Sequence, residues 1–190
     1  MEAVITGTSP LDLTDKERAL EQLVDAYGDG VLQLAYFYLK DRDMAEDVFQ
    51  EVFTKVYFGL HKFRGESSPK TWIYRIAINL CHDKLRSWSM RRVLLIGEDF
   101  FSNLPLLPTE VDAVERVLAA ADRQVLLENV MALPVEYREV VTLYYYEEMD
   151  TREVAEALGL SEGTVRSRLH RARARLKVML TEGGYTHGRA

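Results

Sequence analysis

The 190-residue sequence is poor in cysteine and proline, with one Cys and 5 Pro. The lone Cys81 excludes an internal disulfide and indicates a reducing compartment. The first 20 residues lack a basic start followed by an apolar run, so we expect no secretory signal. Apolar runs elsewhere are too short and too often interrupted by charge to span a bilayer. These absences predict a cytoplasmic protein that is not a membrane protein.

Motifs of enzymes and metal sites are also missing. The sequence has no Gly-x-Ser-x-Gly, no phosphate-binding loop and no Cys-x-x-Cys, and its 4 histidines are scattered. Glu46, Asp47, Gln50 and Glu51 are spaced to share a helix face, as in carboxylate metal sites, but no Glu-x-x-His partner accompanies them. We therefore expect no enzymatic activity, no catalytic residue, no cofactor and no metal.

Positive charge is scarce overall but concentrated locally. Lys and Arg number 24 against 30 Asp and Glu, a formal net charge of −6. Residues 62–92 nevertheless carry 8 basic and 2 acidic side chains, and residues 151–190 carry 8 basic and 4 acidic ones. Because the local field decides where a polyanion binds, these two basic islands are the candidate binding surfaces.

The apolar pattern is helical almost throughout, with no convincing strand alternation. Amphipathic helices are expected at 43–61 and at 69–86, and Ser67 or Ser68 is the candidate N-cap of the second. One or two further helices are expected at 15–39, because Gly28 and Gly30 could interrupt a single helix there. We expect an all-α fold of two small helical domains joined by a linker. The predicted segments are a tail (1–11), a first domain (12–92), an acidic linker (93–121), a second domain (122–182) and a tail (183–190).

The second domain contains a helix-turn-helix pattern. Thr151 is a candidate N-cap for a short helix, Gly159 suits the left-handed residue that ends it, and Ser161 can cap the longer helix that follows. A short helix, a glycine-containing turn and a longer helix are typical of this motif.

The longer helix is laid out for a DNA major groove. Val165, Leu169, Ala172 and Leu176 form one apolar stripe, and the opposite face carries Gly163, Ser167, His170 and Ala174. Small and polar residues allow close approach, while flanking cations meet the phosphates. The flanking cations are Arg166, Arg173 and Lys177 on one side and Arg168, Arg171 and Arg175 on the other. The alternative is a solvated basic helix, which would normally intersperse Glu, and residues 164–180 have none.

The first basic island combines an aromatic residue with cations. Trp72, Arg75, Asn79 and Arg86 share one side of the helix at 69–86, and the preceding loop adds Lys62, Arg64 and Lys70. An aromatic ring among cations can stack unpaired bases while the cations follow the backbone. The alternative for Trp72 is a half-buried core anchor.

Two stretches together carry a family resemblance. They are "DMAEDVFQEVFTKVYFGLHKFRGESSPKTWIYRIAINLCHDKLR" (43–86) and "LPVEYREVVTLYYYEEMDTREVAEALGLSEGTVRSRLHRARARLK" (133–177). In order and spacing the chain resembles an extracytoplasmic-function (ECF) sigma factor, a promoter-specificity subunit of bacterial RNA polymerase. The resemblance implies that the chain directs core polymerase to promoters and initiates transcription.

The resemblance also implies residue roles and partners. Docking on the clamp helices of the largest polymerase subunit falls to Asp47, Val48, Gln50, Glu51 and Phe53. Opening and reading of the −10 element falls to Trp72, Tyr74, Arg75 and Asn79, with Arg86, Lys62, Arg64 and Lys70 beside them. The residues implied to read the −35 element are Arg166, Ser167, His170 and Arg171, and we then expect phosphate contacts from the other cations of that helix, Arg168, Arg173, Arg175 and Lys177. The implied partners are core RNA polymerase (clamp helices and flap), promoter DNA and an anti-sigma factor.

One departure and one rival accompany this interpretation. Pro69-Lys70 stands where the family commonly has a bulky residue, which affects the geometry of the −10 loop. The rival is a stand-alone helix-turn-helix transcription regulator, which would need a sensor or dimerisation domain and would bind duplex DNA tightly without polymerase. No such domain is apparent in the N-terminal half of the sequence.

Overall fold

The computed structural model describes residues 15–89 and 124–182, and within these ranges it is helical without any strand. The helices in chain order are α1 (Lys16–Leu39), α2 (Arg42–Gly59), the 3₁₀ turn η1 (Leu60–Lys62), α3 (Pro69–Ser89), α5 (Val135–Val141), the π-helical turn η2 (Thr142–Tyr146), α6 (Thr151–Leu158) and α7 (Glu162–Glu182). Residues 124–132 are helical as well. The expected all-α fold is confirmed, whereas the expected tails (1–11, 183–190) and linker (93–121) lie outside the described residues.

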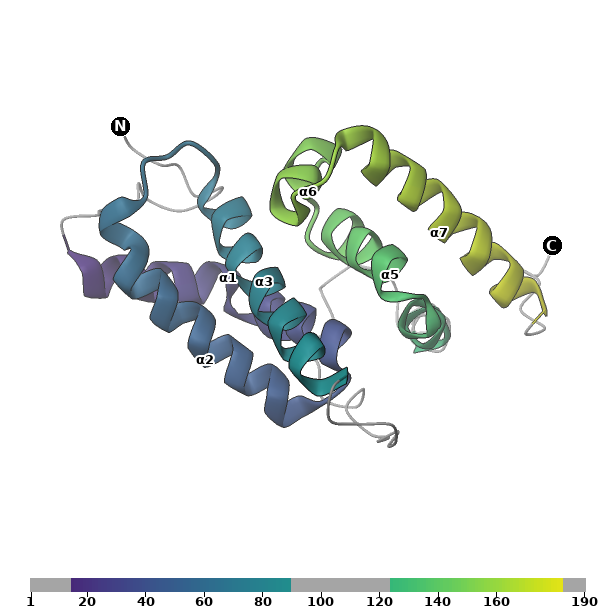
Figure 1. The fold of residues 1–190 in the computed structure, drawn as a ribbon, viewed down its shortest axis with the longest axis horizontal. Helices are drawn as coiled ribbons and strands as arrows, with labels where there is room; N and C mark the ends of the chain where they lie inside the picture. The colour runs from purple at the N-terminus through teal and green to yellow at the C-terminus, as the bar shows by residue number, and fades with distance from the viewer. Residues whose placement is uncertain (1–14, 90–123, 183–190) are drawn as a thin grey trace, which may run out of the picture.

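The N-terminal half is formed by α1, α2 and α3 (Figure 1). Its core is built from the apolar faces of the three helices and includes Leu23, Val52 and Ile73, which are fully buried. Cys81 lies in this core, and burial raises the pKa of its thiol to about 12. The thiol is therefore protonated and shielded, as expected for a packing residue.

Helix α1 runs without a break through Gly28 and Gly30. A Cβ at Gly30 would collide with the Tyr74 hydroxyl and would lie 2.7 Å from a Glu147 carboxylate oxygen. The glycine therefore allows α3 and the start of the helix-turn-helix to approach α1 closely, and it does not mark a helix end.

The C-terminal half is formed by α5, η2, α6 and α7, with α7 packed on both α5 and α6 (Figure 1). The two halves are not separate in the structure. Helix α3 packs against α6, and α1 against α5. The ring of Phe37 meets that of Tyr146 edge-on, with centroids 5.6 Å apart. One hydrophobic core thus extends across both halves.

Candidate nucleic-acid interface

Local hydrogen bonds define the helix-turn-helix at α6 and α7. Asp150, and not Thr151, is the N-cap of α6: its carboxylate accepts hydrogen bonds from the backbone N–H groups of Arg152 and Glu153, both at 2.8 Å. The Glu153 carboxylate in turn accepts from the Asp150 N–H at 3.1 Å, which completes a capping box. The expectation for Thr151 is wrong because an ionised carboxylate accepts backbone N–H groups better than a hydroxyl does, and the Thr151 hydroxyl instead donates to Glu162.

The turn between the helices follows the sequence pattern. Gly159 ends α6 with a φ of 65°, in the left-handed region where glycine is least strained. Ser161 then accepts from the Thr164 N–H at 3.1 Å and caps the start of α7. Ser68 caps α3 in the same way, accepting from the Thr71 N–H at 3.1 Å. The two candidate DNA-binding helices therefore begin where the sequence predicted.

Helix α7 presents the expected outer face. Val165, Leu169 and Ala172 are buried against the rest of the half, while the opposite face is exposed. The residues expected to read bases are all exposed: Arg166, Ser167, His170 and Arg171. Arg166 donates to Glu162 at 2.7 Å, an exposed pair that DNA could readily displace. The face thus has small and polar residues between flanking cations.

The flanking cations of α7 differ in their surroundings. Arg173 donates a hydrogen bond to the Tyr145 hydroxyl at 2.7 Å, and the Arg175 guanidinium lies 5.0 Å from the centroid of the Tyr137 ring. Arg168 instead donates to the buried carboxylate of Glu139 at 2.6 Å. Lys177 belongs to α7, but its side chain lies outside what the structure describes. Arg168 is consequently engaged inside the protein, unlike the other two arginines.

On α3 the expected residues divide into an open group and an enclosed group. Asn79 and Arg86 are exposed, as are Lys62 and Arg64 in the preceding segment. Trp72 is half-buried, with its ring 5.0 Å from that of Phe63. A Cβ at Gly59 would meet the Trp72 ring at 3.0 Å, so the tryptophan also packs on the end of α2. Trp72 therefore anchors the loop that precedes α3 in addition to any role at a surface.

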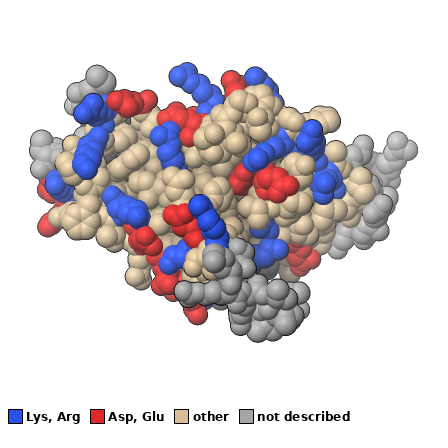
Figure 2. Space-filling model, in the orientation of Figure 1, with Lys and Arg blue, Asp and Glu red and all other residues tan. Residues whose placement is uncertain are grey.

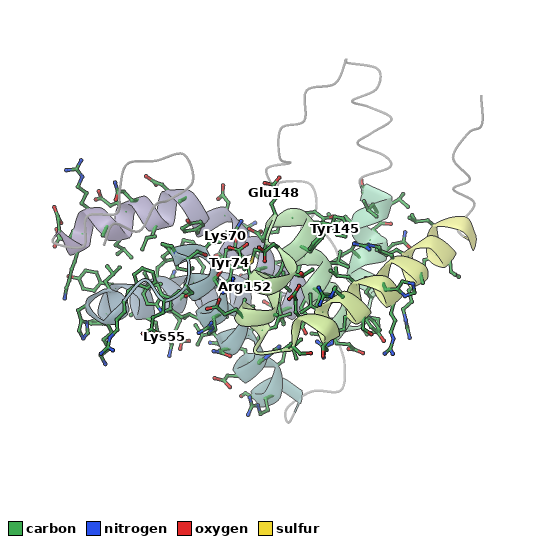
Figure 3. The ribbon with its side chains drawn as sticks, turned by 90° about the horizontal axis from the view of Figure 1, so that it is seen from above. Lys55, Lys70, Tyr74, Tyr145, Glu148 and Arg152 are labelled. Carbon is green, nitrogen blue, oxygen red and sulfur yellow. The ribbon has the colours of Figure 1, made fainter. Side chains whose placement is uncertain are left out.

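The enclosed group contacts the C-terminal half directly. Tyr74 is 1% exposed and donates to the carboxylate of Glu147, and Lys70 donates to the Glu147 backbone carbonyl. Arg75 donates to the Glu156 carboxylate at 2.8 Å. Figure 3 shows Lys70 and Tyr74 close together at this junction. The expectation that Tyr74 faces DNA does not hold in this arrangement, because the C-terminal half covers it.

The face of α2 expected to dock on polymerase is narrower than the sequence suggested. Asp47 and Gln50 are exposed, and Glu51 is half-exposed with Lys55 and Lys84 at 3.6 and 3.9 Å from its carboxylate. Val48 and Phe53 are instead 0% and 6% exposed. These two belong to the apolar stripe that packs on α1 and α3, so they hold α2 in place and are not surface contacts.

No feature of the described residues indicates a metal centre or a membrane span. Within residues 15–89 and 124–182, His, Cys, Asp and Glu side chains do not gather in threes around a point where an ion could sit. None of the helices in these ranges combines the length and the hydropathy of a transmembrane segment.

Comparison with known proteins identifies the family. The chain matches the description "Sigma-70 region 2" over residues 23–90 and "Sigma-70, region 4" over residues 123–176. It is 30% identical over 176 residues to the ECF RNA polymerase sigma factor SigW of Bacillus subtilis (strain 168), covering 86% of this chain and 90% of that one. It is 32% identical over 163 residues to the ECF RNA polymerase sigma-E factor of Escherichia coli (strain K12), covering 83% and 84%. The chain belongs to the ECF sigma factor family.

Solved structures agree with this assignment. The structure of CnrH in complex with the cytosolic domain of CnrY is similar with a TM-score of 0.62 and 26% identity, over 90% of this chain and 92% of that one. The sigma factor RpoE of Bartonella quintana, solved with the anti-sigma factor NepR, has a TM-score of 0.67 at 21% identity, over 87% and 96%, and shows the shared fold. As an ECF sigma factor the chain serves promoter recognition by RNA polymerase, and it is not an enzyme.

In this ECF sigma factor, sequence reasoning missed the acidic residues of region 4 that face region 2. Glu139 is buried and accepts from the Tyr38 hydroxyl at 2.7 Å, with His82 at 3.4 Å and Arg168 on its other oxygen. Glu147 and Glu156 engage Tyr74 and Arg75 as described above. The surplus of acid in residues 131–150, 5 Asp and Glu against one Arg, was the available signal.

The Glu147 carboxylate is buried where the two halves meet, and its neighbours determine its pKa. Burial raises its pKa, while the Tyr74 hydroxyl and the Lys70 ammonium act in the opposite direction. The same burial, together with the neighbouring Glu147 charge, raises the pKa of Tyr74 well above its ordinary value. Region 2 thus supplies hydrogen-bond donors to carboxylates of region 4.

On the face drawn in Figure 2, basic and acidic side chains lie next to each other and do not gather in one patch of a single sign.

Proposed function

We propose that this ECF sigma factor reads the −35 element as duplex through α7 and opens and reads the −10 element through α3. The observation that carries the first part is the exposed face of α7, with Ser167, His170 and Arg171 opposite the buried Val165 and Leu169. These polar residues lie on the outer face of the N-terminal half of α7, which the capped helix-turn-helix holds in place. Side chains in such a position can contact base edges in a major groove.

The second part rests on the open group of α3. Asn79, Arg86, Lys62 and Arg64 are exposed around the half-buried Trp72. Reading the −10 element requires an extruded base, which costs unstacking energy and needs a prepared site. Amide, guanidinium and ammonium donors beside an indole ring supply hydrogen bonds, backbone neutralisation and stacking for an unpaired base.

Docking on core polymerase is proposed for the exposed side of α2, through Asp47, Gln50 and Glu51. An acidic rim on a helix suits a basic helical partner, such as the clamp helices of the largest subunit. Asp47→Lys should weaken assembly with core polymerase, and Asp25→Lys, the same change at an exposed position of α1, is the matched control.

Complete −10 reading requires the two halves to separate. Tyr74, Lys70 and Arg75 are occupied by Glu147 and Glu156 in the structure, so they reach DNA only after region 4 moves off α3. The docking face of α2 and the outer face of α7 are both exposed in this arrangement and are therefore accessible to partners while the halves are still together. We propose that binding to core polymerase draws the halves apart, with residues 93–121 as the connecting linker. An anti-sigma factor is the partner proposed to oppose this step, because the similar sigma factor RpoE of Bartonella quintana was solved in complex with the anti-sigma factor NepR.

In vitro transcription tests the proposal. Purified chain and bacterial core polymerase would be incubated with a library of genomic fragments, with core polymerase alone as the reference. We expect a discrete set of transcripts that depends on the added chain. Transcripts identical with and without the chain would contradict the proposed function.

A further inference from the structure

Three consecutive tyrosines, Tyr144, Tyr145 and Tyr146, form most of the π-helical turn η2. Tyr146 packs edge-on against Phe37 of region 2 and so belongs to the core between the halves. Tyr145 is 50% exposed and is one of the large side chains that the fold leaves at the surface. A π-helical turn is uncommon and often occurs at functional sites. Packing therefore accounts for Tyr146 but leaves the exposed ring of Tyr145 unexplained.

Tyr145 holds a cation of the recognition helix. The Arg173 Nε donates to the Tyr145 hydroxyl oxygen at 2.7 Å, and the guanidinium carbon lies 5.6 Å from the Tyr145 ring centroid and 5.9 Å from that of Tyr144. The two rings meet nearly at right angles, 80°, with centroids 5.0 Å apart. In Figure 3 the labelled Tyr145 lies away from Lys70 and Tyr74, on the C-terminal side of the molecule. The guanidinium is thus fixed by a hydrogen bond and by two aromatic rings.

The contact leaves the binding capacity of Arg173 largely intact. A guanidinium has five N–H donors, of which the bond to Tyr145 uses the one on Nε. The phenol accepts that bond through its oxygen, so its own O–H is still available as a donor. Both Nη groups can then address the two oxygens of one phosphate, the bidentate geometry that arginine favours.

The charge of Arg173 is also not neutralised. In the described part of the chain, Arg75, Arg166 and Arg168 each form an ion pair with a glutamate, whereas no carboxylate lies within ion-pair distance of Arg173. A tyrosine orients a guanidinium without cancelling its charge, which a glutamate at the same place would do. Arg175 on the other flank of α7 has the same kind of neighbour, the ring of Tyr137.

We infer that Tyr145 is a positioning residue for −35 recognition: it pre-orients Arg173 for a backbone phosphate. This inference rests on the proposed role of α7 at the −35 element. Pre-orientation lowers the conformational entropy that a long side chain loses on binding. Because the contact is to the backbone, its effect is independent of the base sequence.

The test uses the holoenzyme, core polymerase with the full chain, on a promoter fragment recovered from the in vitro transcription described above. Tyr145→Phe keeps the ring and removes the hydroxyl, and we expect about 2- to 10-fold weaker binding, the same for different −35 sequences. Tyr57→Phe on α2 is the matched control, since its hydroxyl makes no hydrogen bond within the described residues and it lies outside the Arg173 contact, and it should leave affinity unchanged. The thermal unfolding midpoint of both variants should equal that of the unsubstituted chain.

A double-mutant cycle with Arg173→Ala separates the possible failures. If Tyr145 acts through Arg173, Tyr145→Phe has no further effect once Arg173 is Ala. A loss that persists in that background, or no loss for Tyr145→Phe while Arg173→Ala weakens binding, would overturn the inference alone. If Arg173→Ala itself leaves promoter affinity and its salt dependence unchanged, the proposed phosphate contact of α7 fails as well.

Discussion

Arg171 is the residue at which base selectivity of the recognition helix is most open to test. It is exposed on the outer face of α7 and forms no ion pair within the described residues. Arginine commonly makes a bidentate contact with guanine, worth about 1–3 kcal/mol of discrimination.

Arg171→Ala should therefore cost about 1–3 kcal/mol of promoter binding by the holoenzyme, with the loss confined to promoters that carry the contacted base. Competition binding on a set of −35 variants measures this. Arg18→Ala, the same change at an exposed position of α1, should have no such effect. An equal loss on every −35 sequence would assign Arg171 to a phosphate instead.

Glu147 makes the stability of the protein depend on pH in a definite direction. Its pKa is raised by burial above the ordinary value of 4.5. A carboxyl with a raised pKa in the folded state contributes most stability below its unfolded pKa, and that contribution is lost as the pH rises through the folded pKa.

Glu147→Gln keeps an acceptor for Tyr74 and removes the titration. We expect the variant to be at least as stable as the unsubstituted chain at pH 7, and to lose the part of the pH dependence that begins near pH 4.5. Urea unfolding at a series of pH values provides the comparison. An unchanged pH profile would show that Glu147 ionises as freely in the folded chain as in the unfolded one.

Among the secondary-structure elements, α6 depends on its capping box. Asp150 satisfies two backbone N–H groups that no intrahelical carbonyl can reach. Replacing an N-cap Asp by Ala typically costs about 0.5–2 kcal/mol.

Asp150→Ala should lower the free energy of unfolding by about that amount and should weaken promoter binding, because α6 supports the turn into α7. Thr151→Ala, one residue along, should cost less, since its hydroxyl makes one side-chain hydrogen bond to Glu162. Urea denaturation ranks the two variants, and a larger loss for Thr151→Ala would contradict the assigned cap.

The sequence was sufficient to predict most elements and insufficient to predict their packing. The apolar stripe of α7 and its exposed opposite face follow from helical periodicity, which acts within one segment. The docking role of Val48 and Phe53 came from the family resemblance and not from the helical pattern, and a resemblance does not show which side chains the neighbouring helices bury. The burial of Tyr74 was not predicted because its partner, Glu147, is distant in sequence and belongs to region 4.

Similar reasons explain the other differences. Two glycines weaken an isolated helix, so a break in α1 was a fair expectation, and only the nearby Tyr74 and Glu147 show why Gly30 is needed. Arg168 was predicted as a phosphate contact from its position on a flank of α7. It pairs with Glu139 because that carboxylate, buried among Tyr38 and His82, requires a cation or donors around it.

For the whole molecule, Gly30 offers a way to open the two halves. Alanine at this position favours the helix by about 1 kcal/mol, but its Cβ would collide with the Tyr74–Glu147 pair. We expect Gly30→Ala to retain the helices of region 2 and to separate region 4 from α3.

Small-angle X-ray scattering should show a larger radius of gyration for Gly30→Ala and an unchanged helical content by circular dichroism. Gly28→Ala is the matched control, because a Cβ there would lie 3.3 Å from the Phe49 ring, inside region 2. A scattering profile of Gly30→Ala identical to that of the unsubstituted chain would mean that the junction adapts without opening.

The closed arrangement also bears on how the chain meets DNA. Region 4 carboxylates occupy donors that α3 would offer to the −10 element, and the chain as a whole is acidic, with a net charge of −6. Both features oppose binding of a polyanion to the isolated chain. We expect core polymerase to separate the halves, which would free the α3 donors from the region 4 carboxylates and leave the basic faces of α3 and α7 accessible to DNA.

The most direct test of this account is promoter binding by the purified chain, measured at one salt concentration with and without core polymerase. We expect sequence-specific binding only when core polymerase is present, and little discrimination between promoter and unrelated duplex when it is absent. Equally tight, specific binding by the chain alone would contradict the account and would favour a stand-alone helix-turn-helix regulator.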